Sequence, residues 1–251
     1  MNRRLQGLVA SRLFALKYQT RPVPGERVLM YHSVAGQSWG DSRGTYGIGR
    51  AAFAEQIKSL ASWGLFSLAD SGCFSKRKDS TAIAVSFDDG YKTVLYHAAP
   101  LLAGAGIPFT VFIPTGWVGS VPTVMNKAEI RELLKFPGVT VGSHGVRHIR
   151  LTEATPIGLE EELADSRAFL EDLSGQTVDL LSYPHGACDQ RVAQGARNAG
   201  YRLAFTSRFG INNPRSPRML LRRTDVWATD SCQNFLEKIS GAWDWRGFLG
   251  R

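Results

Sequence analysis

Two carboxylates stand side by side at the end of an apolar segment of the sequence. Asp88 and Asp89 follow the run AIAVSF at 82–87 and come directly before Gly90. Neighbouring carboxylates repel each other, so such a pair needs either a helix that it caps or a cation that it binds. The first interpretation is structural and the second is chemical, and other parts of the sequence bear on the choice.

Two histidines four residues apart provide a second chemical signal. His144 and His148 follow the apolar segment VTVGS at 139–143, and their spacing puts both imidazoles on one side of a helical turn. Alone, such a pair is often two surface histidines. Together with one carboxylate, two imidazoles make a site for zinc or another divalent metal, with positions left open for water and substrate. One aspartate would then bind the cation, and the other would stay free to accept a proton.

Regular elements must position these side chains, and the hydrophobic periodicity predicts alternating strands and helices. Seven strands are expected, at 27–34, 82–87, 109–113, 139–143, 178–183, 203–206 and 219–226. Helices are expected between most of them, around 53–60, 92–106, 127–135, 157–174, 189–199 and 231–240. This alternation is typical of parallel β/α units, closed into a barrel or left as an open sheet.

The polar residues gather at one end of the predicted strands. His32, Asp88, His144 and the segment YPHG at 183–186 all fall at carboxyl ends of strands. Active sites of parallel β/α folds form at this end, where the loops that follow the strands meet. The sequence therefore predicts that four strands direct chemical groups towards one site.

The composition is that of an ordinary globular protein. The chain has 251 residues, 43% of them hydrophobic, which is enough to bury a large core. No linker rich in proline or serine divides the chain, so one domain is expected over 26–251, after an N-terminal segment at 1–25. The formal charge is +8, but the basic residues are scattered, so nucleic acid is not an expected partner. Cys73, Cys188 and Cys232 form no CxxC motif, which fits a reducing compartment.

The segment 1–25 predicts a basic amphipathic helix. Its apolar residues at helical spacing are Leu5, Leu8, Val9, Leu13 and Leu16, with arginines and a lysine between them. Residues 1–20 of such a helix could contact an anionic membrane, or the helix could pack on the barrel or on a partner subunit. Arg12 interrupts the apolar run and no cleavage site follows, so we expect no secretory signal and no membrane span. The expected location is the cytoplasm, with peripheral contact at the inner membrane.

Three motifs resemble those of the polysaccharide deacetylase family, the NodB-homology carbohydrate esterases. They are SFDDG at 86–90, SHGVRH at 143–148 and SYPHG at 182–186. Their order and spacing agree with the family, and the resemblance spans roughly 27–225. It implies an α/β fold of the distorted (β/α)₇ barrel type, which matches the seven strands counted independently. It also implies metal-dependent removal of an N-acetyl, or sometimes O-acetyl, group from a sugar.

The resemblance also implies roles for individual residues. Asp88 would be the general base, while Asp89, His144 and His148 would hold a divalent metal, with Zn²⁺ expected and Co²⁺ or Ni²⁺ as alternatives. The segment LMYHSV at 29–34 resembles a branch of the family with circularly rearranged motifs. In that branch, the histidine of the first strand, His32 here, stands in for the catalytic acid.

Four residues are expected to contact the substrate. Tyr183, Pro184 and His185 belong to the third motif, and Trp227 follows the last predicted strand. His185 could touch the sugar or serve as a second acid. Trp227 corresponds either to the family's tryptophan-lined wall for the acetyl methyl group or to an ordinary core residue.

Two departures from the family pattern bear on activity. Ser182 stands where the family usually carries an arginine that orients the base, so Arg222 or Arg223 is expected to hold Asp88 instead. The usual Leu-x-His near the C-terminus is absent, which leaves the acid role to His32.

The expected activity is N-deacetylation of an acetamido sugar in bacterial surface-polysaccharide or lipopolysaccharide biosynthesis. Without an export signal, a lipid-linked or nucleotide-linked sugar is the expected substrate. Two alternatives remain open. One is a deformylase or amidase that acts on another small amide, and the other is a non-catalytic sugar-binding or metal-binding relative.

Overall fold

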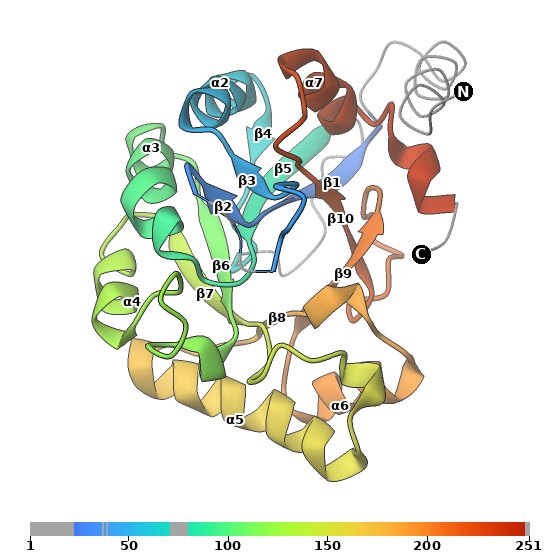
Figure 1. Cartoon of the computed structure of the whole chain (residues 1–251). Coiled ribbons are helices and arrows are strands. Elements are labelled where there is room, and N and C mark those ends of the chain that lie inside the picture. Colours follow the sequence, from blue (N-terminus) through green and yellow to red (C-terminus); the bar gives the residue numbers. More distant parts are fainter. Residues whose placement is uncertain (1–22, 37, 39, 71–79, 249–251) are drawn as a thin grey trace.

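Seven parallel strands close into a barrel in the computed structural model, which describes residues 23–36, 38, 40–70 and 80–248. Around the barrel the neighbours run β1-β10-β9-β8-β7-β6-β5, and β5 pairs with β1 to close it (Figure 1). The strands are β1 (Gly25–Tyr31), β5 (Thr81–Phe87), β6 (Phe109–Ile113), β7 (Val139–Ser143), β8 (Leu180–Ser182), β9 (Leu203–Phe209) and β10 (Leu221–Asp225). The predicted (β/α)₇ barrel is therefore confirmed.

Three short strands distort the regular pattern. β4 (Gly64–Leu65) pairs with the beginning of β5, on the edge that β6 occupies further along. β2 (Ser33–Val34) and β3 (Gly47–Ile48) form a separate two-stranded ladder directly after β1. This ladder brings the loop between β2 and β3 close to the carboxyl end of the barrel.

Helices surround the barrel on its outside (Figure 1). They are α2 (Arg50–Leu60), α3 (Ala99–Gly104), α4 (Lys127–Leu133), α5 (Pro156–Ser174), α6 (Gln190–Asn198) and α7 (Cys232–Ser240). The helix predicted over 92–106 instead begins as a π-helix at Val94–Ala98 and continues as α3. Pro100 lies in the first turn of α3 and has no N–H for an α-helical bond to the preceding turn, which accounts for the irregular start.

The longest helix, α5, has clear local signals at both ends. The Thr155 hydroxyl accepts the Gly158 N–H at 3.1 Å, and Pro156 occupies the first helical position. Both features favour a helix start, because the first amides of a helix lack partners within it. Gly175 ends the helix with φ +67, a conformation that glycine adopts without strain.

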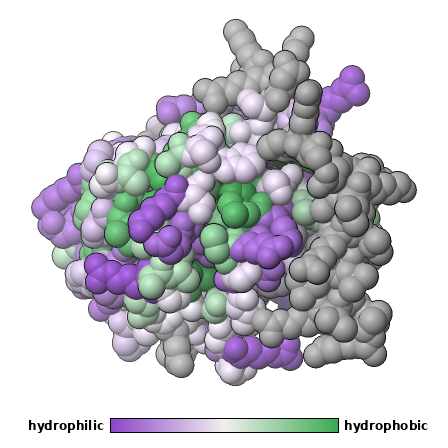
Figure 2. Space-filling model, turned by 90° about the horizontal axis from the view of Figure 1, so that it is seen from above, coloured by the Kyte–Doolittle hydropathy of each residue, from purple (hydrophilic) through white to green (hydrophobic). Residues whose placement is uncertain are grey.

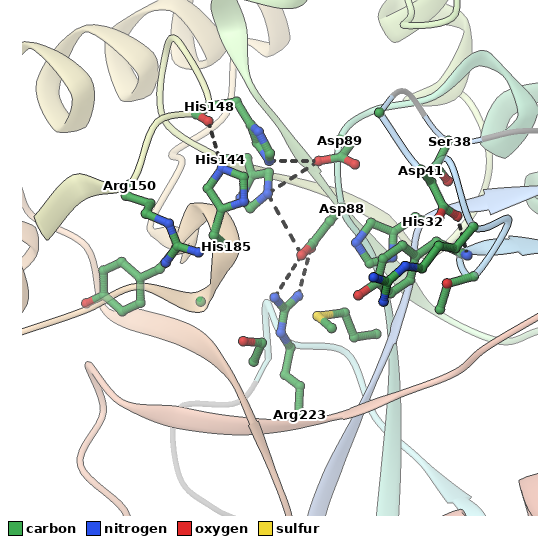
Figure 3. Close-up of a pocket in the computed structure, with 18 of the residues that line it drawn as sticks. His32, Ser38, Asp41, Asp88, Asp89, His144, His148, Arg150, His185 and Arg223 are labelled. Atoms are coloured by element: carbon green, nitrogen blue, oxygen red, sulfur yellow. Dashed lines mark hydrogen bonds and ion pairs between the residues drawn. The ribbon is translucent and has the colours of Figure 1, made fainter. Parts of the chain in front are cut away.

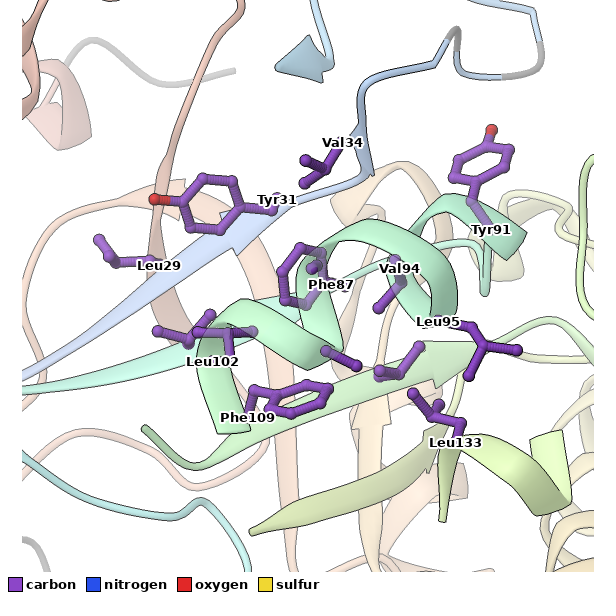
Figure 4. Close-up of a cluster of buried hydrophobic side chains, with 14 of the residues drawn as sticks. Leu29, Tyr31, Val34, Phe87, Tyr91, Val94, Leu95, Leu102, Phe109 and Leu133 are labelled. Atoms are coloured by element: carbon purple, nitrogen blue, oxygen red, sulfur yellow. The ribbon is translucent and has the colours of Figure 1, made fainter. Parts of the chain in front are cut away.

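One layer of the core lies between the strands and the helices. In Figure 4 Leu29, Phe87 and Phe109 of the barrel pack with Leu102 of α3 and Leu133 of α4. All of these side chains are almost completely buried. Their removal from water supplies most of the free energy that holds the helices to the barrel.

A second layer fills the barrel itself. A separate buried cluster draws residues from six of the strands, which can meet only inside the ring: Val28, Ala84, Phe112, Leu180, Leu203, Phe205 and Leu221. Gly142 on β7 makes room there, because a Cβ atom would come within 2.6 Å of the Phe112 ring. Side chains alternate across a strand, so Asp88 and Arg223, separated by even numbers of residues from Ala84 and Leu221, also face inwards. The packed layer inside the barrel lies directly beneath Asp88 and Arg223.

The predicted membrane contact concerns the N-terminal segment and the surface. The helix predicted within 1–25 falls almost wholly on residues 1–22, which lie outside the described residues. Within the described ranges, no helix is long and apolar enough to cross a membrane. Large exposed hydrophobic side chains there come from different elements, namely Tyr96, Ile157, Leu236 and Phe248. On the face seen in Figure 2, hydrophobic residues are interleaved with hydrophilic ones.

Candidate active site

The two adjacent aspartates lie in a sharp turn at the carboxyl end of β5. The Asp88 amide still donates to the Tyr31 carbonyl of β1 at 2.9 Å. Asp89 and Gly90 then adopt positive φ angles of +70 and +65. Such angles are uncommon for residues other than glycine and concentrate at functional sites. The turn sends the neighbouring carboxylates to different partners (Figure 3).

Asp88 is held by Arg223 of β10, which lies two strands away from β5 around the barrel. The guanidinium donates from Nη1 to Oδ1 at 2.7 Å and from Nη2 to Oδ2 at 2.8 Å. Ser182 Oγ donates to Oδ2 at 3.2 Å. A planar, two-bond pair of this kind fixes both the position and the charge of a carboxylate. Arg223 thus takes the place of the arginine missing at Ser182, as predicted for Arg222 or Arg223, whereas Arg222 donates to the Phe209 carbonyl.

Asp89, His144 and His148 lie together on the other side of Asp88. One ligand atom from each of the three falls within 4.8 Å of the others. Asp89 Oδ1 lies 3.2 Å from His148 Nε2 and 3.5 Å from His144 Nε2. His144 Nδ1 lies 2.7 Å from the Ser182 carbonyl, which can only accept, so Nδ1 carries the proton. Nε2 is therefore the nitrogen of His144 that faces Asp89 and can bind a metal.

This group fits a divalent metal. Asp89 Oδ1 is buried and has no hydrogen-bond donor among the described residues, an unfavourable state for a carboxylate unless a cation lies against it. Two imidazole nitrogens and one carboxylate oxygen are a ligand set for zinc and related ions that leaves positions open. Within the ranges that the structure describes, no other group of three or more metal-ligating side chains comes this close together.

The charges of the site reinforce one another. Burial alone raises the pKa of Asp88, but Arg223 and then His144 outweigh it, and the net pKa is lowered. Burial likewise raises the pKa of Asp89, yet the nearby imidazoles of His144 and His148 bring it well below the usual value. The two carboxylates in turn raise the pKa of His144 against the effect of burial. The site therefore keeps two carboxylates ionised at neutral pH and attracts positive charge.

His32 lies on the wall of the same pocket, across from the group of Asp89, His144 and His148 (Figure 3). Its ring packs against Tyr46 with 4.2 Å between ring centroids. Its Nδ1 atom is buried and has no hydrogen-bond partner among the described residues. His32 lowers the pKa of both Asp88 and Asp89, so it lies within electrostatic reach of the two carboxylates.

The third motif forms a 3₁₀ turn at Pro184–Gly186. Tyr183 and His185 line the pocket, whereas Pro184 is buried and does not. His185 adopts φ +57, and its Nε2 lies 3.2 Å from the His148 carbonyl. Burial, followed by the nearby His148, lowers the pKa of His185, so this imidazole is neutral near pH 7.

Trp227 lies outside the wall of the pocket. Its ring packs edge-on against Trp243 with 6.2 Å between centroids, and Lys238 Nζ lies 3.8 Å from its ring centre. Arg246 stacks on the same ring at 4.6 Å. The structure therefore supports the structural alternative for Trp227, a core residue that anchors the C-terminal segment, rather than a wall for the acetyl methyl group.

The pocket measures about 680 Å³ and includes residues that sequence reasoning missed. These are Ser38, Asp41, Arg43 and Tyr46 of the β2–β3 loop, Trp117 after β6, and Arg150 after the second motif. Trp117 packs on His148 with 4.6 Å between ring centroids. It follows the carboxyl end of a predicted strand, so the rule that found Asp88 could also have found Trp117. The β2–β3 loop also follows a predicted strand, at 27–34, but none of its residue types stands out as a chemical signal in the sequence.

A closed seven-stranded barrel with an aspartate beside an Asp-His-His group defines the class of NodB-like hydrolase barrels. The family model described as polysaccharide deacetylase matches residues 75–204, and the chain belongs to this family. The predicted family resemblance is therefore confirmed.

Individual relatives agree with this assignment. The poly-β-1,6-N-acetyl-D-glucosamine N-deacetylase of Staphylococcus aureus is 25% identical over 70% of this chain and 68% of its own length. The Bacillus subtilis protein YxkH, named as a polysaccharide deacetylase, is 24% identical over 79% of this chain and 70% of its own. The Streptococcus pyogenes deacetylase PplD, solved with acetate, has a TM-score of 0.75 at 21% identity, covering 87% of this chain and 99% of that one. At that identity, PplD supports the fold alone.

Proposed function

We propose that the protein is a metal-dependent hydrolase that removes the N-acetyl group of an amino sugar. One observation carries this proposal. Asp88 is buried, ionised and fixed by Arg223, directly beside the group of Asp89, His144 and His148. A base held next to a metal site is the arrangement that amide hydrolysis by water needs.

Asp89, His144 and His148 would hold the ion, with Zn²⁺ expected and Co²⁺ or Ni²⁺ able to replace it. When bound, a divalent ion polarises the acetamide carbonyl and lowers the pKa of water towards about 7. Asp88 accepts the proton of the attacking water. Arg223 and Ser182 hold both oxygens of Asp88, so the carboxylate does not need to reorient as the proton arrives.

The leaving amine needs a proton, because a deprotonated amine leaves poorly. His32 is proposed as the acid, since it lines the pocket and lies near Asp88 and Asp89. General acid–base help of this kind contributes ~10²–10⁴-fold in rate. Tyr183 and His185 border the pocket on the other side and are proposed to contact the sugar, with His185 neutral and able to accept a hydroxyl proton.

The substrate is proposed to be an acetamido sugar in bacterial surface-polysaccharide or lipopolysaccharide biosynthesis. The family, together with a relative named for a poly-N-acetylglucosamine, supports a carbohydrate substrate. A lipid-linked or nucleotide-linked sugar would carry phosphate. Arg43 and Arg150 support this choice: both line the pocket, and the nearest acid to Arg150 is the exposed Glu153, 4.0 Å away. A cytoplasmic location, with residues 1–20 on the inner membrane, belongs to the same proposal.

The proposal is tested by acetate release from purified protein. The protein is stripped with a chelator, reloaded with Zn²⁺, Co²⁺ or Ni²⁺, and incubated with free, β-1,6-linked, nucleotide-linked and lipid-linked N-acetylglucosamine. Metal-dependent acetate release from at least one acetamido sugar is expected. Release of formate alone from formamido analogues would favour the amidase alternative. Metal binding without any turnover would favour the non-catalytic alternative.

A further inference from the structure

The loop that carries both histidines of the metal group has left-handed backbone near each end. It runs from His144 to His148 after β7, with Gly145 at φ +72 and His148 at φ +57. His148 is not a glycine, so its left-handed backbone is unfavourable by itself. Such conformations persist only where surrounding contacts impose them. Something outside the loop must therefore hold His148 where Asp89 and His144 need it.

Glu162 of α5 supplies those contacts. One carboxylate oxygen, Oε2, accepts the Val146 N–H at 2.7 Å and the Arg147 N–H at 3.1 Å. The other, Oε1, accepts Arg147 Nε at 2.6 Å. Glu162 thus binds two consecutive backbone amides between the two histidines, and it also binds the side chain of Arg147.

The burial of Glu162 indicates that this arrangement is specific. Its side chain is 0% exposed, while that of Arg147 is 53% exposed. A glutamate is rarely buried so completely unless its charge is paired and hydrogen-bonded. A glutamate that only makes the helix surface polar would be exposed, as the neighbouring Glu161 is. Glu161 also lies 3.7 Å from Arg147, but that contact is at the surface.

Gly145 fits the same device. A Cβ atom on Gly145 would come within 2.8 Å of Glu162 Oε2, so a larger residue would push the carboxylate off its amides. Its own N–H donates to Ser143 Oγ at 3.1 Å, and Ser143 Oγ lies 2.7 Å from Ser166 Oγ of α5. The helix therefore holds the loop at two points. Glu162 binds Arg147, which precedes His148, and Ser166 binds Ser143, which precedes His144.

We infer that Glu162 is a positioning residue that sets the metal affinity of the site by holding His148 in its left-handed conformation. It touches neither the metal ligands' nitrogens nor the substrate, so it acts only through the loop backbone. Groups that orient metal ligands from behind typically change metal affinity by ~10–100-fold when they are replaced. The role of Glu162 presupposes the metal site proposed above, and the experiment separates the two.

The test is metal affinity in Glu162→Gln, compared with a matched control on the same helix. A glutamine oxygen can still accept from the backbone amides, but its NH₂ group then faces the Arg147 Nε donor. Glu171 is the control, because it accepts the Val178 N–H at 3.0 Å and Arg167 Nε at 3.1 Å. It therefore makes the same kind of contacts to a segment remote from the metal group.

Co²⁺ serves as the probe, with the dissociation constant measured by competition against a chromophoric chelator and the visible spectrum recorded. Glu162→Gln is expected to bind Co²⁺ at least ~10-fold more weakly than wild type, with an altered d–d spectrum. Glu171→Gln is expected to match wild type in both. Thermal melting of the metal-free proteins separates loss of fold from loss of the site.

Arg147→Ala keeps the experiment decisive if Glu162→Gln fails to fold, since Arg147 is largely exposed. It frees Glu162 from its side-chain partner and is expected to weaken Co²⁺ binding measurably, by a factor of two or more. Wild-type Co²⁺ affinity and spectrum in either folded loop variant would overturn the role of Glu162. Failure of the wild-type protein itself to bind Co²⁺ would instead overturn the metal site.

Discussion

Two of the buried ion pairs near β10 behave in opposite ways. Asp88 and Arg223 share two hydrogen bonds inside the barrel, and the pKa of Asp88 is lowered despite burial. Asp230 and Lys238 lie outside the barrel on the loop before α7 and on α7. Burial is the largest influence on that pair, with the pKa of Asp230 raised and that of Lys238 lowered.

Both the neighbouring charges and the cations of the two pairs differ. His144 also lowers the pKa of Asp88, whereas Asp225 also raises that of Asp230. The guanidinium of Arg223 meets both oxygens of Asp88 and also donates to the Thr206 carbonyl and to Ser182. The ammonium of Lys238 is a point charge, shared between Asp230 and the Asp225 carbonyl and covered by the Trp227 ring. A planar cation in a polar setting keeps a carboxylate ionised, while a covered point charge compensates burial only in part. The first pair suits a base, and the second suits an anchor.

Removal of the proposed base, Asp88, is expected to have the largest effect on activity. Asp88→Asn is expected to slow deacetylation by ~10²–10⁴-fold, because an amide cannot accept the proton of water. The variant should still bind Zn²⁺ or Co²⁺ through Asp89, His144 and His148. Acetate release and metal titration on the same sample check both expectations. Near wild-type turnover in a metal-loaded Asp88→Asn protein would remove Asp88 from the base role.

Disruption of the anchor affects stability and leaves the chemistry alone. Lys238→Met leaves Asp230 buried without its cation, and loss of one partner of a buried pair destabilises a protein by about 3–5 kcal/mol. The double variant Lys238→Met with Asp230→Asn removes both charges and is expected to return to within about 2 kcal/mol of wild type. Urea unfolding measures both. Equal losses in the single and double variants would show that the charges do not depend on each other.

The contributions of Asp230 and Lys238 to the stability of the fold are expected to change with pH in opposite directions. Asp230 has a raised pKa in the fold, so the folded protein binds more protons than the unfolded chain between the usual value of 3.8 and the folded value. The contribution of Asp230 to stability is therefore present at low pH and falls as pH rises through that window. Lys238 has a lowered pKa, so its contribution increases as pH approaches the usual value of 10.5. The double variant should lack both trends in urea unfolding measured across pH.

Most of the fold was predictable because its signals are local. The seven strands are short apolar runs followed by turns, and α5 carries its own caps at Thr155 and Gly175. The three motifs were predictable for the same reason, since Asp88 and His144 end strands. What local patterns cannot provide is the partner of Asp88 on another strand. The choice between Arg222 and Arg223 depends on which faces inwards, and β10 changes register against β9 between Leu221 and Arg223.

Other parts of the site were hidden for related physical reasons. Trp227 stands two residues beyond Asp225, and only the packing of the C-terminal segment shows that its ring turns towards Trp243. The β2–β3 loop reaches the pocket because Asp41 Oδ2 accepts the Tyr46 N–H at 2.7 Å, a turn with no distinctive sequence. Glu162 was accessible in principle, since it shares a helix face with the buried Leu159 and Ser166. A glutamate on an apolar face is a signal worth following.

Replacement of Arg223, the cation paired with Asp88, is expected to have an intermediate effect on activity. Arg223→Lys substitutes a point charge for the planar guanidinium, which makes the barrel pair resemble the anchor. The pKa of Asp88 should rise, so the base becomes protonated at a higher pH. The acid limb of the profile of kcat/KM against pH is therefore expected to move to higher pH, and on that limb each unit of rise in the pKa lowers kcat/KM by up to about tenfold. An unmoved acid limb would mean that Arg223 does not control the charge of Asp88.

The smallest effect is expected from Ser182, which touches both members of the barrel pair. Its hydroxyl donates to Asp88 at 3.2 Å and accepts from Arg223 at 2.8 Å. Ser182→Ala leaves the two guanidinium bonds intact, and loss of one such hydroxyl changes stability by about 1 kcal/mol. We expect turnover within about 5-fold of wild type and an unchanged acid limb, because the charge on Asp88 depends on Arg223. A shift of the limb as large as that of Arg223→Lys would assign the control of Asp88 to the hydroxyl, and the distinction between planar and point cations would no longer explain the two pairs.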